Sequence, residues 1–122
     1  NVEMMQKAQS PYSVNVLAAI AAKTAVEDQS FVSSYVTEIL AARELLCVGL
    51  EKLAVPYYDS HANFVLMQVG ARAIPVRDSL RAKGVLVRDR SYEIAGCIRV
   101  TVGSREQVRR FLSEFEAIWK AA

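Results

Sequence analysis

One charged residue interrupts the most regular apolar segment of the chain. Residues 97–102 read Cys-Ile-Arg-Val-Thr-Val, and an amphipathic helix follows them. Because side chains alternate between the two faces of a strand, Ile98 and Val100 share one face and Arg99 lies on the other. One face is therefore expected to pack, while the guanidinium on the other needs a partner. That partner is either a salt bridge or water at a sheet edge, or a ligand carboxylate or phosphate held by the planar fork.

Composition narrows the function classes. The chain has 122 residues, of which 52% are hydrophobic, enough for one domain with a packed core. Its 15 basic and 13 acidic residues are interspersed, which argues against nucleic acid as a partner. Cys47 and Cys97 are too few and too far apart for a disulfide framework or a zinc site, so we expect reduced thiols and no metal. No apolar segment reaches the length of a membrane span and no signal peptide is visible, so we expect a cytoplasmic protein.

Helical periodicity dominates the first half of the chain. Three helices are predicted: one through Val2, Met5 and Ala8, one from Val14 to about Val26 with Ser13 as its N-cap, and one to about Ala54 with Asp28 or Ser30 as its N-cap. The first of them reads like a helix entered midway. We therefore expect the chain to be a piece of a longer protein.

The second half mixes strands and helices. Strands are predicted at 64–67, 85–87 and 97–102, a short helix from Pro75 to Gly84, and a last helix opened by a Ser104/Gln107 capping box. This order predicts an α+β fold, in which helices cover a small mixed sheet of about three or four strands.

A second arginine is a candidate for the same site. Arg88 follows the predicted strand 85–87, and it meets Arg99 if the two strands pair across the intervening loop. Two adjacent cations repel, so Asp89, another segment or a doubly charged ligand is expected to neutralise them. The alternative is a solvated surface cluster of residues 88–90. No catalytic residue is predicted, because the single histidine, His61, lies in a linker and the five lysines follow helical patterns typical of solvated amines.

Four motifs carry a resemblance to a known family. They are Pro-Tyr-Ser-Val-Asn at 11–15, Ser-His-Ala-Asn-Phe at 60–64, Gly-Val-Leu-Val-Arg-Asp at 84–89 and Ile-Arg-Val-Thr-Val-Gly-Ser at 98–104. In this order and spacing, from about Asn1 to Trp119, they resemble the C-terminal part of histidinol-phosphate aminotransferase, a class I/II, fold-type I pyridoxal-phosphate enzyme. The family usually has Asn at the position of Ser13 and often Glu at that of His61, departures that leave both arginines untouched.

The resemblance implies a substrate-binding role. It implies that Arg99 holds the substrate α-carboxylate and Arg88 the substrate phosphate, so that the bound amino acid is oriented for reaction. Residues 1–122 would then be the small domain of a larger transferase of histidine biosynthesis, with residues 1–10 the end of the interdomain helix. The family's Schiff-base lysine and other cofactor-binding residues lie upstream, so this fragment is expected to bind no cofactor and to be inactive alone.

The resemblance also implies partners and leaves alternatives. The parent is expected to be a homodimer acting on a small amino acid or keto acid. One alternative is the small domain of a threonine-phosphate decarboxylase or an aromatic aminotransferase. Another is a freestanding α+β anion-binding or dimerisation module.

Overall fold

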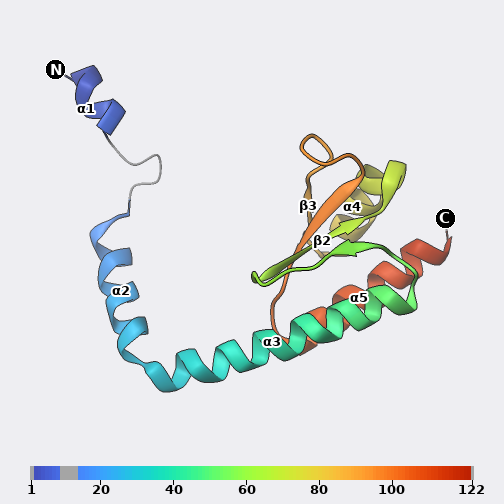
Figure 1. The fold of residues 1–122 in the computed structure, drawn as a ribbon, viewed down its shortest axis with the longest axis horizontal. Coiled ribbons are helices and arrows are strands. Elements are labelled where there is room, and N and C mark those ends of the chain that lie inside the picture. The colour runs from blue at the N-terminus through green and yellow to red at the C-terminus, as the bar shows by residue number, and fades with distance from the viewer. Residues whose placement is uncertain (1, 9–13, 122) are drawn as a thin grey trace. The chain divides into compact units, whose positions relative to one another are not determined.

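A computed structural model describes residues 2–8 and 14–121, and it divides the chain into two compact units, Asn1–Tyr35 and Val36–Ala122 (Figure 1). In chain order the elements are α1 (Val2–Ala8), α2 (Val16–Glu27), α3 (Gln29–Lys52), β1 (Tyr57–Tyr58), β2 (Phe64–Gln68), the 3₁₀ turn η1 (Gly70–Arg72), α4 (Ala73–Ala82), β3 (Arg88–Asp89), β4 (Cys97–Thr101) and α5 (Arg105–Ala121). Each unit is described by itself.

In the first unit, side-chain caps fix where α2 and α3 begin. Asn15 caps α2, because its Oδ1 accepts a hydrogen bond from the backbone N–H of Ala18 at 2.8 Å. The predicted cap, Ser13, lies outside the described residues. Asp28 caps α3 as one of the two predictions had it, accepting from the N–H of Phe31 at 3.1 Å. This hydrogen bond, and a second one that the Ser30 hydroxyl donates at 2.8 Å, hold the pKa of Asp28 below its ordinary value.

The second unit is built on a four-stranded sheet in the order β1-β2-β4-β3. The predicted α+β class and the number of strands are confirmed. The three described strand pairs are all antiparallel, so the sheet is not the mixed one that was predicted. The two-residue strand β1 is not among the predicted strands. It pairs with β2 through Tyr57↔Met67 and Tyr58↔Leu66.

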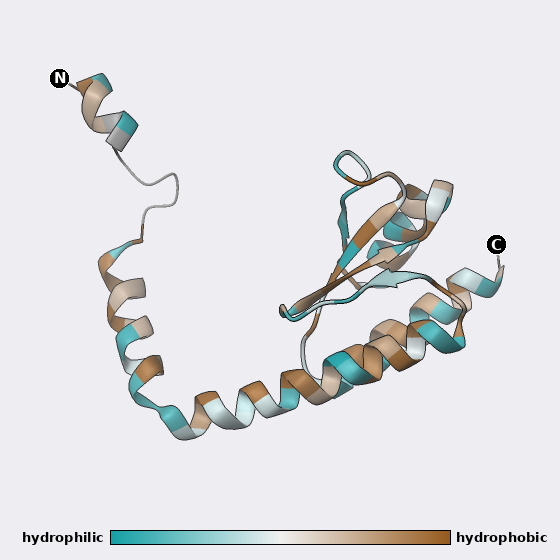
Figure 2. Cartoon of the chain, in the orientation of Figure 1, coloured by the Kyte–Doolittle hydropathy of each residue, from teal (hydrophilic) through white to brown (hydrophobic). Residues whose placement is uncertain are grey.

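The core lies between the helices and one face of this sheet. Val65 and Met67 of β2 share that face with Ile98 and Val100 of β4, and all four are buried. They form one cluster with the buried residues of the helices, which are Ala42, Leu46 and Leu50 of α3, Ala73, Val76 and Leu80 of α4, and Val108, Phe111 and Phe115 of α5. Along α3 and α5 hydrophobic residues alternate with hydrophilic ones (Figure 2). Because Ile98 and Val100 both face this core, the predicted alternation in 97–102 is confirmed, and Arg99 lies on the face away from the core.

The edge strand β3 lies further along the chain than the sequence predicted. Residues 85–87 form no strand, and β3 is Arg88–Asp89. The reason is the end of α4, where the N–H of Val85 donates to the carbonyl of Leu80 at 2.9 Å and Gly84 has a φ of +73°. This Schellman motif turns Val85 toward the core, so the chain reaches β4 only at Arg88. Helix α4 also begins at Ala73, which places Pro75 inside its first turn, where a missing N–H costs nothing.

The helix that follows β4 begins at the predicted capping box. The N–H of Gln107 donates to Ser104 Oγ at 3.3 Å, and Gln107 Oε1 accepts from the N–H of Ser104 at 2.9 Å. Glu38 of α3 adds a second cap, since its carboxylate accepts from the N–H of Arg105 at 2.7 Å and from that residue's Nε at 2.8 Å. The backbone hydrogen bond, and then the guanidinium, hold the pKa of Glu38 below its ordinary value. These contacts fix where β4 ends and α5 begins.

The end of α3 offers a test of the backbone geometry. The N–H of Val55 donates to the carbonyl of Leu50 at 3.0 Å, so α3 ends in a Schellman motif whose left-handed residue is Ala54, with a φ of +52°. Because a Cβ is strained there, Ala54→Gly is expected to raise the free energy of unfolding by about 0.5–1 kcal/mol in urea titrations. Ala82→Gly, the same change at the last residue of α4, should lower it by a similar amount. A loss of stability in Ala54→Gly would contradict the strained geometry.

Candidate functional site

The register of the sheet places the two candidate arginines opposite each other. Arg88 of β3 and Arg99 of β4 are Cα partners in the antiparallel pair. Directly opposed residues point to the same face, so both side chains lie on the face away from the core. We call this the arginine face, defined by Tyr58, Phe64, Leu66, Gln68, Arg88 and Arg99. The conditional prediction that the two arginines meet across paired strands is confirmed.

The neighbouring acid does not neutralise these cations. Asp89 alternates to the other face, where its Oδ2 lies 4.0 Å from Nη1 of Arg77 on α4. Arg90 forms an ion pair with Glu93 in the loop that follows. Within residues 2–8 and 14–121, no ion pair reaches Arg88 or Arg99. Of the three partners expected from the sequence, Asp89 is therefore ruled out.

The described surroundings of Arg99 give its guanidinium no hydrogen-bond or ion-pair partner. The residue is half-buried, and its Nε is buried with no hydrogen-bond partner among the described residues. Its Cζ lies 5.1 Å from the centroid of the Phe64 ring. A guanidinium with free in-plane donors binds a carboxylate or phosphate through two parallel hydrogen bonds. The arginine face can therefore hold an anion, and with Arg88 one that carries two negative charges.

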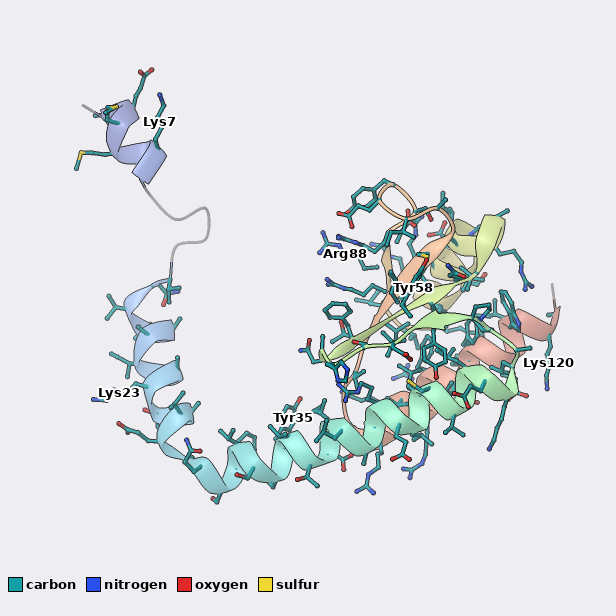
Figure 3. All side chains as sticks on the ribbon, in the orientation of Figure 1. Lys7, Lys23, Tyr35, Tyr58, Arg88 and Lys120 are labelled. Atoms are coloured by element: carbon teal, nitrogen blue, oxygen red, sulfur yellow. The ribbon has the colours of Figure 1, made fainter. Side chains whose placement is uncertain are left out.

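Three further residues of this face escaped the sequence analysis. Phe64 contacts Arg99, and Gln68 Nε2 donates to the Tyr58 hydroxyl at 2.7 Å. Tyr58 and Arg88 belong to the two edge strands, on either side of the central pair (Figure 3). The adjacent tyrosines 57 and 58 were the available signal for β1, because aromatic residues favour strands. Phe64 and Gln68 become neighbours of the arginines only through the register, which the sequence did not determine.

Among the residues that the structure describes, the arginine face holds no lysine or histidine for covalent catalysis. The five lysines are exposed and lie on helices or just after one, and three of them pair with acids on helices: Lys23 with Glu27, Lys83 with Glu114 and Lys120 with Glu116. His61 is exposed ahead of β2. Across the described ranges, no group of three His, Cys, Asp or Glu side chains is placed to hold a metal ion.

Among the described helices, none combines the length and the hydropathy that a membrane-spanning segment needs.

Comparisons with known proteins identify the family of the chain. The model of the family "Aminotransferase class I and II" matches residues 2–115. Over 117 residues the chain is 33% identical to a histidinol-phosphate aminotransferase 1 of Carboxydothermus hydrogenoformans, covering 96% of this chain and 34% of that protein. It is 38% identical over 111 residues to the histidinol-phosphate aminotransferase of Symbiobacterium thermophilum, covering 90% of this chain and 31% of that protein.

A solved structure shares the fold. The histidinol-phosphate aminotransferase from Clostridium acetobutylicum superposes with a TM-score of 0.78 at 21% identity, covering 93% of this chain and 36% of that one. The chain thus spans about a third of the length of the curated relatives that it matches. Since the family model matches nearly the whole chain, residues 2–115, the chain belongs to the class I and II aminotransferases.

Proposed function

We propose that this chain is the substrate-binding small domain of a pyridoxal-phosphate aminotransferase that moves an amino group between histidinol phosphate and 2-oxoglutarate. The observation that carries the proposal is the pairing of Arg88 with Arg99, with no acid between them, on the face that the core leaves free. Both substrates carry at least two negative charges. Relatives named histidinol-phosphate aminotransferase support this choice of substrate.

In this proposal each arginine has its own anion. Arg99 binds the α-carboxylate of the amino acid or keto acid. Its strand, β4, pairs with a neighbour on each side, so the backbone that carries the guanidinium fork is held on both edges. Arg88, on the edge strand, binds the phosphate of histidinol phosphate. Histidinol phosphate has no carboxylate and glutamate has no phosphate, so each contact serves one half of the reaction. It holds one charged end of the bound substrate and excludes water there, which converts binding energy into correct alignment.

The cofactor belongs to the family as a whole. Class I and II aminotransferases use pyridoxal phosphate, which withdraws electrons from the substrate Cα when it is bound. The lysines of this chain lie on or next to helices, and none belongs to the strands that carry the arginine face, so no described residue fits as its covalent anchor. We therefore propose that the rest of the protein supplies the lysine and that the chain alone does not transaminate. Residues 1–10 would end the helix that joins the two domains of a cytoplasmic, homodimeric enzyme.

Turnover by the full-length protein tests the substrate. Histidinol phosphate with 2-oxoglutarate is expected to be the preferred pair, and Arg88→Ala should raise the KM for histidinol phosphate by roughly tenfold to a hundredfold, as removal of a charged hydrogen bond does. The KM for glutamate should change much less, because Arg99 binds its α-carboxylate. Both values come from steady-state assays.

Three results would contradict the assignment. Turnover of phenylalanine without turnover of histidinol phosphate would indicate an aromatic aminotransferase and remove the phosphate role of Arg88. Release of CO₂ from threonine phosphate would indicate a decarboxylase. A parent gene whose reading frame starts near residue 1 would favour the freestanding anion-binding or dimerisation module.

A further inference from the structure

The arginine that binds the carboxylate is itself held by an aromatic ring. Phe64 sits on β2, where its Cα partner on β4 is Thr101, two residues beyond Arg99. Diagonal neighbours on one face lie within reach of aromatic and long side chains. The measured separation agrees, since Arg99 Cζ lies 5.1 Å from the centre of the Phe64 ring. We propose that Phe64 is a positioning residue, which orients the Arg99 guanidinium for the substrate carboxylate.

The geometry suits this role because a ring and a carboxylate use different parts of a guanidinium. An aromatic ring attracts the cation through its face, whereas the hydrogen-bond donors lie in the guanidinium plane. A protein carboxylate in the same place would occupy those donors and compete with the substrate. Phe64 restricts the rotation of Arg99 without taking any of its hydrogen-bond donors.

Two other arginines lie over aromatic rings, and unlike Arg99 they also form hydrogen bonds with the protein. Arg72 lies 3.3 Å from the Trp119 centroid, and its Nη1 donates to the Trp119 carbonyl at 3.2 Å. Arg90 lies 5.3 Å from the Tyr92 centroid, donates to the Tyr92 hydroxyl at 2.7 Å and pairs with Glu93. Both of these guanidinium groups therefore already form hydrogen bonds within the protein, and that of Arg90 also forms an ion pair.

Arg99 differs from both. In the described part of the chain it has a ring contact and a buried Nε without a partner, and no hydrogen bond or ion pair of its guanidinium joins it to another residue. Exposure at the surface does not explain this, because Arg99 is half-buried. The structure thus holds this guanidinium in place while keeping its fork unused. A preorganised fork binds its anion at a lower entropic cost than a mobile one.

Phe64→Leu in the full-length protein tests the role, which rests on the proposed carboxylate contact of Arg99. A cation–π contact of half-buried groups corresponds to roughly a threefold to tenfold change in binding. We therefore expect the KM for glutamate to rise by about that factor, with kcat nearly unchanged. Phe64→Tyr keeps the ring and should restore the wild-type value. Phe64→Met, unbranched and without a ring, replaces Phe64→Leu if that variant fails to fold.

A double variant separates positioning from packing. If Phe64 acts through Arg99, then Phe64→Leu added to Arg99→Ala should raise the glutamate KM no further. Trp119→Leu is the matched control, because it removes a ring from beneath Arg72 on the helical side of the sheet. It should leave the glutamate KM unchanged.

The outcomes distinguish the two proposals. If Arg99→Ala raises the glutamate KM while Phe64→Leu and Phe64→Met do not, the positioning role is wrong and the carboxylate contact stands. An equal rise for Phe64→Leu with and without Arg99 would show that the ring acts on something else. If Arg99→Ala itself has no effect, both proposals are overturned.

Discussion

Arg99→Ala in the full-length protein is expected to reduce kcat/KM for glutamate by roughly thirtyfold to several thousandfold, which corresponds to about 2–5 kcal/mol of lost binding in the transition state. The loss is large because the two central strands carry no other basic side chain, and Arg88, which faces the same way from the edge strand, is assigned to the phosphate. Arg99→Lys keeps the charge but loses the fork, so it should recover only part of the activity.

Controls decide whether this loss comes from binding or from folding. Arg109→Ala removes an exposed arginine of α5, on the helical side of the sheet, and should leave the kinetics unchanged. Thermal unfolding of the Arg99 variants should stay close to that of the wild type, because Arg99 forms no ion pair whose loss would leave a buried charge within the described residues. Unchanged glutamate kinetics in a folded Arg99→Ala protein would remove the carboxylate assignment.

The part of the site that depends on local pattern was predictable from the sequence. Alternation alone placed Arg99 on the face of its strand that Ile98 and Val100 do not share, and the structure buries those two residues in the core. Capping chemistry is equally local, and the Ser104/Gln107 box begins α5 where it was expected. Such features need only the covalent geometry of the chain and the hydrogen bonds of its next few residues.

The position of β3 required information that a local pattern does not contain. Val85-Leu86-Val87 has the composition of a buried strand, and that composition is real, since Val85 and Val87 are half-buried against the core. They reach it, however, as the connection that leaves the Schellman end of α4. Whether an apolar run pairs or merely packs depends on where the preceding helix ends in space.

Side-chain neighbours across strands lie one step further from prediction. The contact between Phe64 and Arg99 joins residues 35 positions apart, and it exists only in the register Leu66↔Arg99. A shift of one residue would move Phe64 to the other face of the sheet. The two arginines, by contrast, were predicted to meet on the condition that their strands pair across the intervening loop, and these strands do pair.

The loop between β3 and β4 depends on a close contact of two glycines, and Gly96→Ala is expected to disrupt it. Gly96 has a φ of +71°, and a Cβ at this position would lie 2.6 Å from the Cα of Gly70. The Gly96 carbonyl also accepts hydrogen bonds from the N–H groups of Val69, at 2.8 Å, and Gly70, at 3.1 Å. Because a backbone atom cannot rotate away, left-handed strain and overpacking add, to a loss of about 2–5 kcal/mol.

Gly70→Ala is the matched control, since its φ of +61° imposes a similar backbone strain while a Cβ there meets nothing within 4 Å. It should lose only about 1–2 kcal/mol in the same urea titration. Equal losses for both variants would show that the close approach contributes nothing.

If the contact is real, Gly96→Ala pushes the 90–96 loop away from the end of β2, and β3 loses the anchor that holds it in register. A destabilised but folded full-length Gly96→Ala enzyme should then show an increased KM for histidinol phosphate before its KM for glutamate changes, because Arg88 lies on the edge strand and Arg99 on a central one.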